Sequence, residues 1–90
     1  IERIPGHRYS WEQWMIDLAR RIVYQAVKDL CDDSPLERVT AALYFVEGRH
    51  VNNCKDASID PVKIKESVLE IIKEDGIRRR KLVKDLLKQI

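Results

Sequence analysis

The sequence predicts an all-α fold, a compact bundle of about five helices in one domain that spans residues 1–90. Apolar residues recur at steps of three and four along most of the chain, which is the period of one helix face. Helix-starting residues precede these segments at Ser10, Ser34 and Asp60. No stretch alternates apolar and polar residues for long, so we expect no sheet.

The first helix is predicted over residues 10–30, after an N-terminal arm at residues 1–9. Ser10 and Gln13 have the spacing of a capping box, which fixes the start of the helix. Residues 31–34 end it. Its apolar positions, which we expect to form the central scaffold, are Trp11, Trp14, Met15, Leu18, Ala19, Ile22, Val23, Ala26, Val27 and Leu30.

A second helix is predicted from Pro35 to about Glu47. Ser34 and Glu37 form another capping box, and proline is well suited to the first helical position. Gly48 is the natural left-handed stop. The predicted inner stripe consists of Leu36, Val39, Leu43 and Val46, widened by Ala42, Tyr44 and Phe45.

Three further helices are predicted over residues 49–57, 61–75 and 77–90, with Gly76 separating the last two. The middle one of these has Ile64, Val68, Leu69, Ile71 and Ile72 inside. The last one is amphipathic, and its apolar stripe consists of Leu82, Val83, Leu86, Leu87 and Ile90. This stripe is either the interface with a partner or a second copy, or part of the protein's own core.

Residues 49–75 have the spacing of a helix-turn-helix, in which the second helix of a pair reads DNA. Cys54 supplies the small residue that faces the second helix, and Ser58 falls in the tight turn, where glycine is often found. Ile59 then fills the angle between the two helices. Asp60, followed by proline, predicts the start of the second helix.

The candidate DNA-binding residues are the outward positions of this second helix and two asparagines in the first. Such side chains can contact phosphates or the edges of bases. They are Asn52, Asn53, Val62, Lys63, Lys65, Glu66 and Ser67. The alternative is an ordinary solvated face of mixed charge, with asparagines that only cap a turn.

The densest run of charge consists of Arg78, Arg79, Arg80 and Lys81. This run begins the last helix, where the helix dipole disfavours cations, and bound phosphates would offset that cost. The alternative is a set of ion pairs within the chain, with Glu74, Asp75 and Asp85 as partners. Arg49 and His50 would add to the same positive surface.

Charge is distributed unevenly between the two halves of the chain. Charged residues make up 36% of the sequence, yet the net charge is only +2. Residues 1–47 carry six Lys or Arg against eight Asp or Glu, a net of −2, whereas residues 48–90 carry eleven against seven, a net of +4. A negatively charged partner such as duplex DNA would therefore approach the second half.

Catalytic and metal sites find little support. His50 and Cys54 are one helical turn apart, but a zinc site needs about four ligands and no further paired spacing is present. Glycine is too sparse to build a phosphate-cradling loop. We therefore expect no enzyme activity, no metal and no cofactor. Cys31 and Cys54 are expected to be free, buried thiols.

No apolar run approaches the roughly 18 to 20 residues of a membrane span, and the chain does not start with a signal-like apolar core. We therefore expect a cytoplasmic, intracellular protein with no membrane partner. The chain is short enough that a homodimer or higher oligomer is an expected partner state.

The run Ala42 to Gly48, followed by Cys54 to Pro61, resembles small phage or prophage proteins with a helix-turn-helix, including the DNA-recognition domains of small terminase subunits. The resemblance covers residues 42–68 and implies binding of duplex DNA through the second helix, in dimers or larger rings. It assigns to the groove Val62, Lys63, Lys65, Glu66 and Ser67.

We therefore expect a non-catalytic DNA-binding domain from a phage or mobile element, acting in regulation, replication or packaging. The alternative is a helical module for protein–protein interaction or dimerisation that does not bind DNA.

Overall fold

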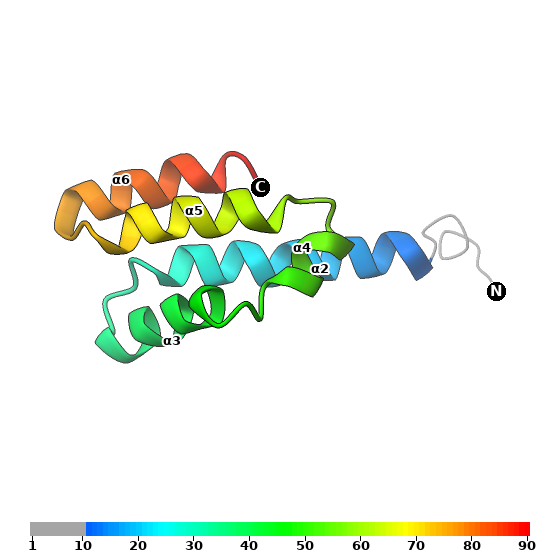
Figure 1. Ribbon diagram of the computed structural model, residues 1–90, viewed down its shortest axis with the longest axis horizontal. Coiled ribbons are helices and arrows are strands. Elements are labelled where there is room, and N and C mark those ends of the chain that lie inside the picture. The colour runs from blue at the N-terminus through cyan, green and yellow to red at the C-terminus, as the bar shows by residue number, and fades with distance from the viewer. Residues whose placement is uncertain (1–10) are drawn as a thin grey trace.

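The computed structural model describes residues 11–90, which form five helices and no strand (Figure 1). The prediction of an all-α fold is therefore confirmed. The arm at residues 1–9 and the start of the first capping box at Ser10 lie outside the described residues. The helices are α2 (Trp11–Asp29), α3 (Pro35–Val46), α4 (Val51–Asp56), α5 (Pro61–Ile72) and α6 (Gly76–Leu87).

The helix boundaries follow from local capping. Ser34 accepts a hydrogen bond from the backbone N–H of Glu37 at 3.5 Å, and Asp60 accepts one from Val62 at 2.9 Å. Gly48 has a φ of +77°, the left-handed conformation that ends α3. Gly76 opens α6 with a φ of +58° and therefore lies at the reversal between α5 and α6.

Four helices form a ring of neighbours. α2 packs against α3 and α6, and α5 packs against the same two helices. The short α4 packs on both α2 and α5. In Figure 1, α5 and α6 run along the top, with α2 and α3 below them. α4 therefore bridges α2 and α5.

The core is a single cluster to which every helix contributes. Fully buried Phe45 of α3 is its largest side chain. Burial of aromatic and aliphatic side chains of this kind is the main favourable term in folding. The cluster consists of Val23, Val27, Leu30, Ala41, Phe45, Cys54, Ile64, Val68, Ile71, Val83 and Leu86.

The predicted inner face of α3 is wrong. The buried residues are Ala41 and Phe45, while the expected stripe points away from the core: Leu36, Val39, Leu43 and Val46 are 72%, 56%, 43% and 44% exposed. α3 has apolar residues on two opposite faces, and periodicity alone cannot choose between them. The small Ala41 allows close packing beside Phe45, whose ring buries more apolar surface than any aliphatic side chain of the stripe.

The first half of α2 is also more exposed than its apolar spacing predicts. Figure 1 shows this end of α2 extending beyond the other described helices. Trp11 and Trp14 stack on each other, with ring centroids 4.9 Å apart, instead of entering the core. The other exposed apolar residues of α2 are Met15, Leu18, Ile22 and Tyr24, and in α5 the expected core residue Leu69 is 38% exposed.

The apolar stripe of α6 belongs to the core of this chain. Val83 and Leu86 are buried, so they have no surface to offer a partner. Partly buried residues pack beside them: Leu82, Leu87 and Ile90. The structure thus favours core packing over the expected partner interface on this helix.

Candidate nucleic-acid interface

The connection between α4 and α5 is built around Ser58. Its φ of +60° makes it the only non-glycine residue among those described with a left-handed backbone. The backbone N–H of Ile59 donates to the carbonyl of Cys54 at 2.8 Å, which closes the turn. Cys54 and Ala57 are buried, so small side chains stand where α4 approaches its neighbours. Ser58 lies in the turn between the two helices, as the sequence predicts.

His50 is not part of a positive surface, because its side chain is 1% exposed. Its Nε2 lies 3.1 Å from the carbonyl oxygen of Pro61, which can only accept, so Nε2 donates the hydrogen bond. The ring lies beside Phe45, with centroids 5.3 Å apart. His50 thus links the start of α4 to the first turn of α5 and fixes how the two helices meet.

The amide of Asn53 is also occupied within the chain. Its Nδ2 donates a hydrogen bond of 2.8 Å to the hydroxyl of Tyr44 on α3. Burial of Tyr44 raises the pKa of its phenol above the ordinary value, although the bond from Asn53 acts in the opposite direction. The predicted phosphate contact of Asn53 is therefore replaced by a structural one. Asn52, one residue earlier, is exposed.

Lys63 and Lys65 lie on different sides of α5. Lys63 and Ser67 line a hollow of about 210 Å³ beside Leu86 of α6. Lys65 lines an apolar hollow of about 410 Å³ between α4 and α5, together with Lys55. The predicted groove-facing residues are therefore divided between two flanks.

The outermost line of α5 lies between these flanks. Val62 is 64% exposed, and Glu66 is exposed one turn further along. Glu70 continues this line and forms an ion pair with Lys73 at 3.3 Å. The centre of the exposed face is thus apolar and acidic, and the cations stand at its edges.

Sequence reasoning missed Lys55. This residue is exposed on α4 and lines the same hollow as Lys65. Its position three residues after Asn52 places both side chains on neighbouring parts of one helix face, because residues three apart in a helix lie close together. That spacing, read together with the expected short helix, is the signal that would have found it.

The basic run at the start of α6 is partly used by ion pairs. Arg78 lies 3.0 Å from the carboxylate of Glu74, and Arg80 lies 3.6 Å from that of Asp33. Arg79 is half-buried, and its Nε has no hydrogen-bond partner among the described residues. Lys81 is exposed. Two of these four residues thus support the alternative of internal ion pairs.

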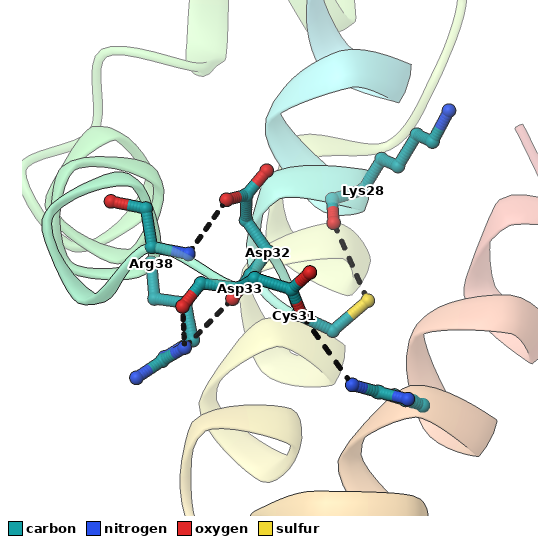
Figure 2. A network of polar contacts seen from close by, with 7 residues as sticks. Lys28, Cys31, Asp32, Asp33 and Arg38 are labelled. Carbon is teal, nitrogen blue, oxygen red and sulfur yellow. Dashed lines mark hydrogen bonds and ion pairs between the residues drawn. The ribbon is translucent and has the colours of Figure 1, made fainter.

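Arg38 holds in place the loop between α2 and α3, which contains the ion-pair partner of Arg80. Figure 2 shows Arg38 reaching back to this loop, where its Nη1 donates to the carbonyls of Asp32 and Asp33 at 2.7 and 3.1 Å. The carboxylate of Asp32 accepts from the backbone of Ser34 at 2.8 Å. A hollow of about 270 Å³ here is lined by three arginines and three aspartates: Arg38, Arg79, Arg80, Asp32, Asp33 and Asp75. Its formal charges cancel, so it favours neither anions nor cations.

The basic run stands far from the turn between α4 and α5. α5 has 12 residues and is therefore about 18 Å long. The α4–α5 turn lies at one end of it, and the reversal into α6 lies at the other, as Figure 1 shows. The structure thus separates the two groups of candidate DNA contacts.

Both cysteines are free thiols. Cys54 is fully buried, and this burial, with a smaller effect from Asp60, raises the pKa of its thiol to about 11. Cys31 is half-buried and lies 3.4 Å from the carbonyl of Lys28 (Figure 2). Among residues 11–90, no three His, Cys, Asp or Glu side chains are grouped so that they can hold a metal ion.

No helix within the described range combines the length and hydropathy needed to cross a membrane. No family model, no curated protein and no solved structure matches this chain. Its function is therefore inferred from its own residues and their arrangement.

Proposed function

We propose that the protein binds duplex DNA through α4 and α5 and performs no chemistry on it. The observation that carries the proposal is the turn at Ser58, whose left-handed backbone joins a short helix to a longer one. Cys54 is a small buried residue of α4, and His50 links the start of α4 to the first turn of α5. These are the features by which a helix-turn-helix presents its second helix to a groove.

The two flanks of α5 suit the two walls of a major groove. Lys63 on one side, and Lys65 with Lys55 on the other, would contact phosphates of opposite strands. Between them, Val62 would contact a thymine methyl group and Glu66 would accept from a cytosine amino group. In this arrangement the acidic centre of the face would contact bases and would not contact phosphates.

The process in which this binding would act is inferred from the resemblance of residues 42–68 alone. Proteins of that kind are phage or prophage proteins, so we propose a role in regulation, replication or packaging for a phage or mobile element. The positive second half of the chain is consistent with a nucleic-acid partner.

The test is the salt dependence of DNA binding, measured by fluorescence anisotropy with labelled duplex DNA. Loss of one phosphate contact lowers the slope of log K against log salt by about 0.9, so Lys63→Ala with Lys65→Ala should lower it by about 1.8. The matched control, Lys84→Ala with Lys88→Ala, removes the same charge from exposed positions near the end of α6. An equal effect of both pairs would contradict the assigned face.

The alternative function, a protein–protein interaction module, is favoured by one observation. The first half of α2 exposes an aromatic and aliphatic surface around Trp11 and Trp14. Sedimentation with duplex DNA at low and moderate salt separates the two functions. A salt-sensitive complex supports DNA binding, whereas no complex at either salt concentration favours the interaction module.

A further inference from the structure

The hollow of about 410 Å³ between α4 and α5 has the size and lining of a small-molecule site. Such sites have volumes of about 300 to 1,000 Å³ and mostly apolar walls. Here the apolar wall is formed by Val51, Pro61, Val62 and Leu69. None of these four side chains belongs to the core cluster, so part of their apolar surface is left to contact a ligand. We call this space the α4–α5 hollow.

Two lysines line the α4–α5 hollow, one from each helix. Lys55 of α4 is exposed, whereas Lys65 of α5 is only partly exposed. A lysine in such a position can extend its methylene stem along an apolar wall and keep its ammonium group in water. Among residues 11–90, neither lysine forms an ion pair. Glu66 also lines the hollow, so two positive charges against one negative leave a formal charge of +1.

We propose that the α4–α5 hollow binds a small monoanionic amphiphile, a molecule with one carboxylate or similar anionic group on an apolar body. The apolar body would cover the wall and release water from it. The anionic group would lie near the ammonium groups of Lys55 and Lys65. The formal charge of +1 favours a single negative charge on the ligand and disfavours a cation with the same apolar body.

The surroundings of the hollow favour a small molecule over a macromolecule. A stable protein partner covers roughly 800 Å² on each side, which requires a surface that extends well beyond one hollow. Immediately after Leu69, α5 continues with Glu70, which forms an ion pair with Lys73 at 3.3 Å. The apolar wall is therefore bounded by charged side chains at this end.

The α4–α5 hollow overlaps the surface proposed to bind DNA, since Val62, Lys65 and Glu66 belong to both. A bound amphiphile would therefore exclude duplex DNA from this flank of α5 and act as a regulator. This consequence rests on the proposed function. The binding of the amphiphile does not rest on it, so that binding is measured on the whole chain without DNA.

The test is an NMR titration of the labelled chain with octanoate up to about 10 mM, because ligands of about ten non-hydrogen atoms bind with roughly millimolar affinity. Saturating shifts are expected for the backbone amides of Val51, Lys55, Lys65 and Leu69 and for the ring of His50, all of which line the hollow. Octylamine, a cation with the same apolar chain, should bind at least tenfold more weakly. Shifts that do not saturate, that map outside the hollow or that are matched by octylamine overturn the proposal.

Two pairs of variants test the residues. Lys55→Ala with Lys65→Ala should weaken octanoate binding about tenfold. Its control, Lys84→Ala with Lys88→Ala, removes the same charge from exposed positions near the end of α6 and should leave binding unchanged. An equal effect of both pairs overturns the assigned anion contacts.

Leu69→Glu puts a carboxylate into the wall and should abolish octanoate binding. Leu43→Glu makes the same change on α3 at a similar exposure, 43% against 38%, and should bind octanoate as the wild type does. Circular dichroism verifies that the variants are folded, and equal binding by the two glutamate variants overturns the proposal. A chain that binds octanoate in the hollow but binds no duplex DNA would support this site and contradict the proposed function.

Exclusion of DNA is measured by fluorescence anisotropy with labelled duplex DNA. Saturating octanoate should lower the affinity of the wild type for the duplex, and the same concentration of octylamine should not. Unchanged DNA affinity at saturating octanoate overturns the exclusion.

Discussion

At the scale of single residues, the turn between α4 and α5 depends on a serine in a conformation that disfavours side chains. Ser58 has a φ of +60°, where an L-residue costs about 1–2 kcal/mol relative to the right-handed region. Ser58→Gly removes that cost but adds about 0.5–1 kcal/mol of backbone entropy to be lost on folding. We expect a net gain of roughly 0.5–1 kcal/mol in the free energy of unfolding, measured by urea denaturation.

The control for this substitution is Gly48→Ala, which makes the reverse change at a φ of +77°. Nothing lies within 4 Å of an added Cβ there, so only the backbone conformation resists the side chain. We expect a loss of about 1 kcal/mol. If Ser58→Gly instead lowers stability, the serine side chain contributes more to the turn than its backbone conformation costs.

The Cys54 thiol should make stability depend on pH in the alkaline range. Burial raises its pKa from 9.0 to about 11, so the unfolded chain loses this proton before the folded protein does. The contribution of the protonated thiol to the free energy of unfolding is therefore fully present below pH 9 and is lost as pH rises towards 11. Two pH units correspond to about 2–3 kcal/mol.

This pH dependence is measured as the difference in unfolding free energy between the wild type and Cys54→Ala. The substituted side chain is small enough for the same buried position and cannot ionise. The difference should shift in favour of Cys54→Ala between pH 9 and pH 11. A difference that stays constant over this range would show that the thiol ionises equally in both states.

At the scale of helices, the starts of α3 and α5 were predictable, whereas α5 and α6 end three residues before the expected positions 75 and 90, and the buried face of α3 was not predictable. Capping is local: Ser34 and Asp60 bind backbone N–H groups two or three residues away, so a short window of sequence contains the whole interaction. Burial depends on which neighbour packs against a helix. In α3 both faces are apolar, and only the ring of four helices places Phe45 inward and Leu43 outward.

This inversion gives a direct test of the α3 packing. Phe45→Ala removes a fully buried ring and should cost about 3–5 kcal/mol of unfolding free energy. Leu43→Ala, which truncates a 43% exposed side chain, should cost about 1 kcal/mol or less. Both costs are measured by urea denaturation at the same protein concentration. Similar costs for the two variants would contradict the observed orientation of α3.

At the scale of the whole molecule, tertiary contacts decide which candidate residues are free to bind a partner. Asn53, His50 and Arg80 are residue types that often contact DNA. Each of them, however, forms a hydrogen bond or an ion pair with a residue from another part of the chain. Lys63 is exposed and Lys65 is partly exposed, but the two residues lie on opposite flanks of α5. Sequence spacing predicted the position of α4 and α5. The contacts between residues far apart in the sequence become visible only in the folded chain.

The separation of the two basic groups leads to a prediction about how many phosphates the protein contacts. A duplex seated on the first turn of α5 is about 18 Å from the start of α6, because α5 lies between them. In addition, Arg78 already has Glu74 as an ion-pair partner at 3.0 Å. We therefore expect Arg78→Ala with Lys81→Ala to change the salt slope of DNA binding by less than one phosphate contact.

The comparison is again with Lys63→Ala and Lys65→Ala, measured by anisotropy on the same duplex. Both double variants lose two positive charges, so a general electrostatic attraction would weaken equally in each. A larger effect at Lys63 and Lys65 would support DNA docking on the first turn of α5. A larger effect at Arg78 and Lys81 would instead locate the DNA at the reversal between α5 and α6, because the charges that matter are those within a Debye length of the phosphates, about 8–10 Å.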